Sequence, residues 1–262
     1  MRAGVGRFDP DRLEAMRAQC REPECVEDGG ALQIWKQPQK SGGWRDLPLA
    51  YIIGADTSEG GEHSSYCTAI VIEQGTGEVV ASLHGRWHDH VYAEKLAELG
   101  HRYNEAVVAV ERNNTGLSVL NTLINGGMEE WKVGRTEEWK VGGMEGWKDD
   151  IITLHSSNLP PFHSSILPYP SIYHDQDDKP GWCTDGQSRP VLLAMLDRAI
   201  EEGWWNAPDE ELLGELQTVI HYPDRKPRAA PGRYDDRVIA AGIALCAREE
   251  GWGWGDFDVE VF

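Results

Sequence analysis

The sequence predicts an α/β fold with one mixed sheet, made of a three-stranded antiparallel meander plus parallel strands and flanked by helices. Residues 49–56 (LAYIIGAD) form a continuous apolar run with β-branched residues, which is typical of a strand buried on both faces. Two further β-rich runs, within residues 67–87, surround the turn sequence GTG and predict a hairpin. Because the three runs follow one another directly, they predict the meander.

Helical and strand-like segments alternate after the meander. Residues 90–103 place apolar side chains at helical spacing, and residues 106–111 (AVVAVE) predict a fourth buried strand that ends on a carboxylate. A helix is expected over residues 115–124, a fifth strand over residues 151–156, and a Pro- and His-rich loop over residues 160–179. Three more helices are predicted in the C-terminal part, over residues 189–202, 209–220 and 234–250.

We divide the chain into a lead-in over residues 1–45, a main domain over residues 46–250 and an acidic aromatic tail over residues 251–262. The lead-in combines one short helix, over residues 10–24, with a Gly/Pro/Lys-rich linker. Within the main domain, residues 126–150 hold three copies of an eight-residue repeat, each carrying Trp-Lys. Eight residues rotate a helix face by about 80°, so the repeat is interpreted as an inserted β-ribbon.

Charge and composition restrict the function. The formal net charge is −19, which excludes a protein that binds nucleic acid or anionic membrane through a uniformly basic surface. Any contact with nucleic acid must be local or carried by bound cations. The five scattered cysteines favour reduced thiols over a disulfide framework. No apolar run approaches the ~20 residues that cross a bilayer, so we expect a cytoplasmic protein without a membrane partner.

Four carboxylates stand out by their positions in these elements. Asp56 ends the first buried strand, Glu111 ends the fourth, and Asp235 and Asp236 open the last helix. If the first and fourth strands are parallel neighbours, Asp56 and Glu111 meet at one rim of the sheet, and a helix crossing the sheet brings the third group. Such carboxylates repel one another, so the site requires cations, and an all-oxygen ligand set favours Mg²⁺ or Mn²⁺.

Simpler explanations of the same four residues stay open. Asp56 can form a strand-end turn, and Glu111 can pair with Arg112 or cap the following helix. Asp235 and Asp236 are also acids of the kind that the helix macrodipole favours at an N-terminus.

The order of elements, with acids on the first strand, the fourth strand and a late helix, resembles the ribonuclease H-like superfamily. In its detail the sequence resembles the nuclease domain of the viral terminase large subunit, the DNA-packaging motor protein of tailed phages. Three acidic motifs and a segment leading into a helix carry this resemblance: IIGADTSEG (residues 52–60), VVAVERNNTG (107–116), YDDRVIAAGIAL (234–245) and GWCTDGQSRP (181–190).

The resemblance implies a metal-dependent DNA endonuclease that cuts concatemeric viral DNA during genome packaging. Two Mg²⁺ or Mn²⁺ ions would act on the phosphodiester, with Asp56 bridging both ions. Glu111 and one of Asp235 and Asp236 would each complete one metal's shell. Adjacent helical residues point about 100° apart, so only one of the two ligates, and we favour Asp235. Four basic residues are candidates for contacts with DNA phosphates: Arg112, Lys179, Arg189 and Arg233.

The sequence also departs from the family pattern. It contains no GxxxxGK[ST] phosphate loop, so the expected partners include an ATPase motor domain, a portal and a small terminase subunit besides double-stranded DNA. Tyr234 stands where the family often has a histidine before the acidic pair.

Three alternative functions were weighed. One is another ribonuclease H-like nuclease, such as a junction resolvase. Another is a non-catalytic docking module whose acidic surface binds a basic packaging protein. Actin-like sugar kinases also end their first strand in Asp, but they need a duplicated domain and glycine-rich phosphate loops, which 262 residues with one meander cannot supply.

Overall fold

The central sheet contains the predicted meander and the predicted fourth strand. The computed structural model describes residues 6–40, 50–58, 66–113, 115–125, 171–222 and 226–251. The meander consists of β3 (Tyr51–Asp56), β4 (Cys67–Glu73) and β5 (Val79–Gly85), each antiparallel to the next. β6 (Val107–Val110) lies on the other side of β3 and runs parallel to it. The mixed sheet expected from the sequence is therefore confirmed.

The lead-in contributes two strands to the same sheet. β1 (Cys25–Glu27) and β2 (Leu32–Ile34) form a short hairpin, and β2 pairs antiparallel with β5. The full order is β1-β2-β5-β4-β3-β6. The helix α1 (Pro10–Arg17) also packs into the main core, where Leu13 is buried. Residues 6–40 are thus structurally continuous with the domain that follows them.

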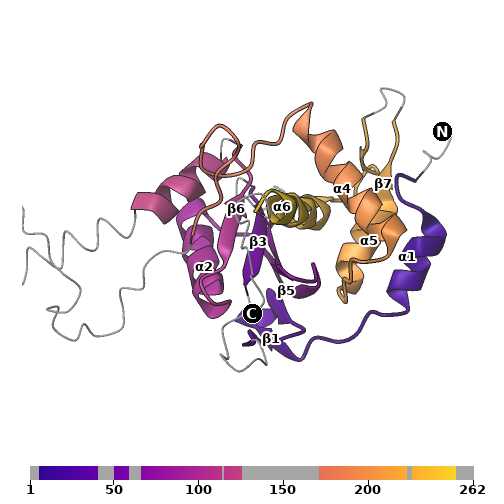
Figure 1. Cartoon of the computed structure of the whole chain (residues 1–262), viewed down its shortest axis with the longest axis horizontal. Helices are drawn as coiled ribbons and strands as arrows, with labels where there is room; N and C mark the ends of the chain where they lie inside the picture. The colour runs from indigo at the N-terminus through magenta and orange to yellow at the C-terminus, as the bar shows by residue number, and fades with distance from the viewer. Residues whose placement is uncertain are drawn as a thin grey trace, which may run out of the picture.

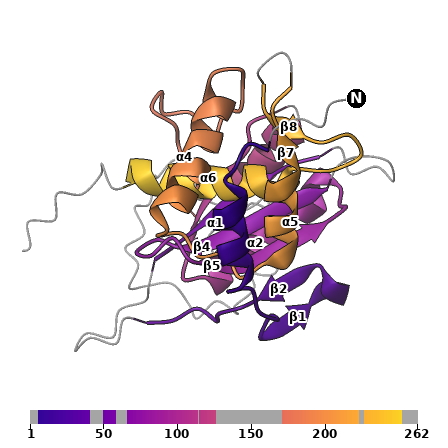
Figure 2. The ribbon, with the colours of Figure 1, turned by 90° about the vertical axis from the view of Figure 1, so that its right-hand side faces the viewer.

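Helices cover both faces of the sheet (Figure 1). One face packs against α2 (Asp89–Arg102) and a helix over residues 115–125. The other face packs against α6 (Asp236–Gly251), which crosses β3 and β4. On the side of α6 away from the sheet lie α4 (Ser188–Glu202), α5 (Glu210–Thr218) and α1, which are nearest the viewer in Figure 2. Both faces of the sheet are therefore buried, as the apolar strands required.

Alternation along the strands assigns side chains to the two layers. In β4, Ile70 and Ile72 face α6, whereas Ala69 and Val71 face α2. At Gly54 of β3 the helix α6 comes especially close. A Cβ atom there would lie 2.1 Å from the carbonyl oxygen of Ala240. Only glycine allows this approach, which places the N-terminal part of α6 against the strand that carries Asp56.

The segment after the repeat is the loop predicted over residues 160–179. Its described part, residues 171–179, contains isolated bridges and a turn but no named strand or helix, in agreement with the predicted loop. Ile172, and Trp182 just after the loop, form parallel bridges with Val108 and Glu111. Backbone hydrogen bonds from Val108 to Ser171 and from Trp182 to Val110 thus hold the segment beside β6, and the local sequence does not indicate them.

Two predicted helices end earlier than expected. The helix predicted over residues 10–24 ends at Arg17, because the chain then turns and the Arg21 amide donates to the carbonyl of Pro208. The helix predicted over residues 209–220 is capped by Asp209 and ends at Thr218. The next residues form β7 (Val219–Ile220), which pairs with β8 (Arg228–Ala229).

Several predictions fall outside the described residues. They are the fifth strand over residues 151–156, the β-ribbon over residues 126–150 and the aromatic tail over residues 252–262. Within the described part of the chain, no helix is both long and apolar enough to span a bilayer.

Candidate active site

Three carboxylates from separate elements converge at one edge of the sheet. Asp56 is the last residue of β3, and Glu111 directly follows β6. Because β3 and β6 are parallel neighbours, their ends meet, and the Glu111 amide donates to the carbonyl of Ala55 at 2.7 Å. Asp236 opens α6, whose N-terminal part crosses β3 beside them.

Asp56 and Glu111 interact directly. Both side chains are buried, and they share a hydrogen bond between their carboxyl groups. Burial raises the pKa of Asp56 well above its ordinary range, and the charges of Glu111, Asp236 and Asp235 raise it further. Burial next to other carboxylates therefore disfavours the charged form of Asp56.

An amide orients Glu111. Asn113 donates from Nδ2 to Oε2 of Glu111 at 2.7 Å, and its Oδ1 accepts from the hydroxyl of Thr57 at 2.8 Å. The same Oδ1 accepts from the amide of Gly116 at the start of the next helix, also at 2.8 Å. Asn113 thus links the residue after Asp56 to the residue Glu111 and fixes one face of the Glu111 carboxylate.

Asp236 is held by the start of β4. Its Oδ2 accepts a hydrogen bond from the amide of Tyr66 at 3.0 Å. Burial raises the pKa of Asp236 to about 6, with further increases from Asp235 and Glu111 and opposing effects from Tyr66 and Arg237. Asp236 therefore belongs electrostatically to the cluster of Asp56 and Glu111.

Asp235 points to a different part of the surface. Its Oδ2 accepts from Nη2 of Arg189 and, at 3.2 Å, from the amide of Ala229. It lines a neighbouring cavity of about 670 Å³ rather than forming a hydrogen bond with the other carboxylates. These contacts favour Asp236 over Asp235 as the third carboxylate beside Asp56 and Glu111, whereas the sequence alone favoured Asp235.

The four predicted DNA-contacting residues are dispersed. Arg189 forms an ion pair with Asp235, the chain neighbour of Asp236. Arg112 directly follows Glu111, but its side chain forms an ion pair with Asp175 at 2.7 Å. Exposed Lys179 pairs with Asp177 at 3.0 Å, and Arg233 is exposed just before Tyr234.

The carboxylates form a cluster that a cation would have to reorganise. Among the described residues, no three His, Cys, Asp or Glu side chains already enclose a single metal position. The ion pairs among the same residues do not include Asp56, Glu111 or Asp236. The cluster therefore holds excess negative charge whose present compensation is protonation and neutral hydrogen bonds, and buried oxygen donors of this kind fit a hard divalent cation.

Sequence reasoning missed the residues that hold the carboxylates. Asn113 stands two residues after Glu111, and this spacing is the signal by which its amide could have been found. Tyr66 acts through its backbone amide, which carries no sequence signal. His84 and Arg237 contact each other at 3.3 Å from β5 and α6, and no local pattern connects them.

Comparison with known proteins supports the fold. Neither a protein-family model nor a curated protein matches the sequence. The structure is similar to that of the large terminase nuclease from thermophilic phage G20c with bound magnesium. The TM-score is 0.58 at 17% identity, over 93% of this chain and 98% of that chain. For the same nuclease with bound cobalt, the TM-score is 0.54 at 15% identity, over 89% and 96% of the two chains. The chain thus has the fold of large terminase nuclease domains, which confirms the ribonuclease H-like fold class.

Proposed function

We propose that this protein is a metal-dependent DNA endonuclease that acts in viral genome packaging, where it cuts concatemeric DNA. One observation carries the proposal: Asp56, Glu111 and Asp236 converge as buried carboxylates from two parallel strand ends and a crossing helix. The structural similarity to a large terminase nuclease with bound magnesium supports the same proposal.

The donor set fits two Mg²⁺ or Mn²⁺ ions. Asp56 would be one ligand, since it interacts with Glu111 and with the charge of Asp236. Glu111 and Asp236 would be the other protein ligands. When bound, such ions activate the attacking water and stabilise the leaving 3′ oxygen of a phosphodiester.

The chain's own residues prepare these ligands. A ligand carboxylate must be in its charged form, and Asn113 holds the Glu111 carboxylate in place through its hydrogen bond to Oε2. Tyr66 keeps one oxygen of Asp236 occupied, which leaves the other free to turn toward the cluster.

DNA would approach along the cavity that Asp235 lines. Basic side chains from three segments surround it, and the acidic ones are fewer, in contrast with the overall charge of −19. Its charged residues are Arg7, Arg189, Lys226 and Arg228 against Asp185 and Asp235. Arg7 and Arg189 are paired with Asp197 and Asp235, and Lys226 and Arg228 add positive charge that would attract a phosphate backbone despite the net charge of the protein. Arg112, Lys179 and Arg233 remain candidates for more distant phosphate contacts.

The biological setting is part of the same proposal. Double-stranded DNA is the proposed substrate, and the proposed partners are an ATPase motor domain, a portal and a small terminase subunit. The proposed location is the host cytoplasm.

The test is cleavage of supercoiled plasmid by the wild type and by Asp56→Ala, each with Mn²⁺, Mg²⁺, Ca²⁺ or EDTA. We expect nicking and linearisation that require Mn²⁺ or Mg²⁺ and disappear in the variant. A folded wild type that cleaves with none of these ions would contradict the proposal and favour a docking module.

A further inference from the structure

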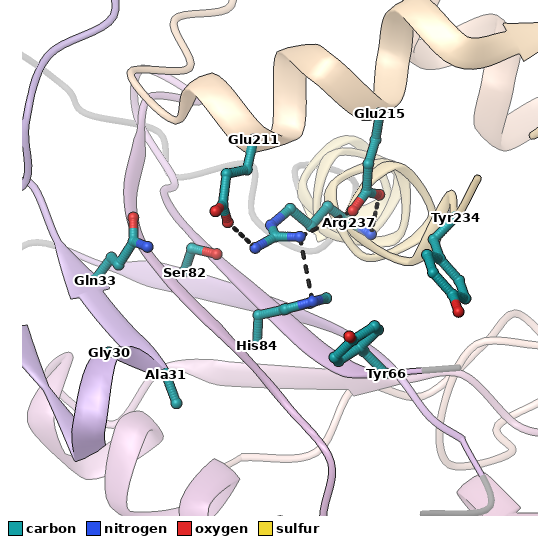
Figure 3. Close-up of a pocket in the computed structure, with 10 residues that line it drawn as sticks. All are labelled: Gly30, Ala31, Gln33, Tyr66, Ser82, His84, Glu211, Glu215, Tyr234 and Arg237. Carbon is teal, nitrogen blue, oxygen red and sulfur yellow. Dashed lines mark hydrogen bonds and ion pairs between the residues drawn. The ribbon is translucent and has the colours of Figure 1, made fainter. Parts of the chain in front are cut away.

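A pocket of about 370 Å³ lies on the side of α6 that faces β2 and β5 (Figure 3). Its walls come from β5, from the first turn of α6, from α5 and from the chain before β4. Figure 3 shows Arg237 at its centre, between Glu211 and Glu215 on one side and His84 on the other. Arg237 lines this pocket and directly follows Asp236, so the pocket adjoins the candidate active site.

Arg237 is anchored mainly by α5. Its Nη1 donates to Oε1 of Glu215 at 2.9 Å, and its backbone amide donates to Oε2 of the same residue at 2.8 Å. Its Nη2 donates to Glu211, and its Nε lies 3.8 Å from Oδ2 of Asp209. The side chain is only 9% exposed. Backbone and side chain of one residue are therefore held together, which restricts the rotation of the first turn of α6.

His84 connects this anchor to the sheet. Nη1 of Arg237 lies 3.3 Å from Nε2 of His84, and because a guanidinium only donates, Nε2 is the acceptor. Nδ1 then carries the proton and donates to the hydroxyl of Thr68 at 2.8 Å. Burial, with the charges of Arg237 and Arg86, lowers the pKa of His84 to about 3. The ring is thus neutral at physiological pH, as an acceptor must be.

Tyr66 returns the chain of contacts to Asp236. Its ring stacks on His84 with the centroids 4.3 Å apart, and the guanidinium of Arg86 lies 4.2 Å from the Tyr66 ring centroid. The backbone amide of the same Tyr66 donates to Asp236. The contacts therefore form a closed circuit from Asp236 through Arg237, His84 and Tyr66 back to Asp236.

We propose that His84 and Arg237 are positioning residues. They orient the side chain of Asp236, rather than that of Asp235, toward the metal site. Adjacent helical residues point about 100° apart, so the rotational position of the first turn of α6 decides which of the two carboxylates faces Asp56 and Glu111. Arg237 fixes the rotational position of α6 through its hydrogen bonds to α5. His84 stacks on the ring of Tyr66 and so fixes the backbone amide that donates to Asp236. This inference rests on the proposed function, because it takes Asp236 as a metal ligand.

The experiment measures Mn²⁺ binding by calorimetry without DNA, and the half-saturating Mn²⁺ concentration for plasmid cleavage. His84→Leu removes the acceptor for Arg237, whereas His84→Gln can offer a side-chain oxygen near the position of Nε2. Groups that orient metal ligands typically contribute 10- to 100-fold in affinity, so we expect His84→Leu to weaken Mn²⁺ binding about 10-fold. His84→Gln should recover most of the loss. His101→Leu, on α2 and away from the site, serves as the matched control and should bind like the wild type.

The outcomes separate this inference from the proposed function. A His84→Leu protein that loses thermal stability but binds Mn²⁺ with wild-type affinity has lost only packing, and the inference is overturned. Equal losses in the Leu and Gln variants would overturn it as well. If the wild type neither binds Mn²⁺ nor cleaves, the proposed function fails and the inference fails with it.

Discussion

Asn113 donates its side-chain amide to Oε2 of Glu111 across 2.7 Å and at the same time accepts the hydroxyl proton of Thr57. One neutral residue therefore connects the ends of β3 and β6, the two strands that carry Asp56 and Glu111. This connection leads to the first of five predictions.

Asn113→Ala removes the donor that fixes the Glu111 carboxylate. We expect plasmid cleavage to fall about 10- to 100-fold, because a ligand without its orienting partner costs that much in comparable metal sites. Initial cleavage rates at saturating Mn²⁺ measure the effect. Unchanged rates would mean that Glu111 keeps its position without Asn113.

Asp236→Asn and Asp235→Asn should differ sharply. Asp236 belongs to the carboxylate cluster, so its variant should lose more than about 100-fold in cleavage and most of its Mn²⁺ affinity. Asp235 pairs with Arg189 near the surface, so its variant should retain Mn²⁺ affinity within about threefold. Calorimetry measures the Mn²⁺ affinity of both variants. A greater loss in Asp235→Asn than in Asp236→Asn would favour Asp235 as the metal ligand, as expected from the sequence.

Arg189→Ala should weaken DNA binding without affecting metal affinity. Loss of one phosphate contact reduces the slope of log affinity against log salt concentration by about 1. Fluorescence anisotropy with a labelled duplex in Ca²⁺, across a salt series, measures that slope. Arg198→Ala, on the same helix but paired with Glu202 at its far end, is the control and should leave the slope unchanged.

Glu215 should make the stability of the protein decrease as pH rises from 6 to 8. Burial raises the pKa of Glu215 to about 7 from an ordinary value of 4.5, although Arg237 opposes the shift. The folded protein then binds this proton more tightly than the unfolded chain. The stabilisation is complete below the unfolded pKa and disappears as pH rises through the folded one. Glu215 alone contributes a decrease of about 1 kcal/mol over this range.

Urea unfolding in EDTA at several pH values measures this dependence. Glu215→Gln cannot take up the proton, so its stability should fall less with pH than that of the wild type between pH 6 and 8, even if it is lower at every pH. His84 opposes the effect of Glu215 below about pH 7, because the unfolded imidazole binds a proton there that the folded ring, with its pKa lowered to about 3, does not. The difference between wild type and Glu215→Gln isolates the carboxyl group, and an equal pH dependence in the two proteins would be inconsistent with the raised pKa of Glu215.

Gly54→Ala should destabilise the protein by about 3 kcal/mol or more. Its new Cβ would lie 2.1 Å from the Ala240 carbonyl and 2.5 Å from the Ala244 amide, so α6 would have to move away from β3. Gly214→Ala is a matched control inside α5, where a Cβ meets no atom within 4 Å, and should instead stabilise by about 0.5–1 kcal/mol. Urea midpoints compare the two. Equal midpoints would show that the helix adapts to a side chain at residue 54.

Local patterns in the sequence were enough to predict the centre of this protein. The apolar run of residues 49–56 and the strand before Glu111 require burial on both faces, and parallel pairing of two such strands brings their terminal acids together. The proximity of Asp56 and Glu111 followed from that reasoning, and so did the crossing helix that supplies a third carboxylate. Strands of six or seven residues carry enough pattern to be recognised, whereas β1 and β2, with three residues each, do not.

The rotation of α6 was decided by tertiary structure. Asp235 and Asp236 have the same chemistry and adjacent positions, so no local pattern separates them. Their separation depends on Arg237, which is bound by Glu215 from one layer and contacts His84 from another. The sequence by itself determined which strands are buried and that acids end them, because burial and alternation are properties of short segments. Only the packed structure decided which carboxylate enters the site, because a helix rotates to satisfy contacts from residues that are distant along the chain.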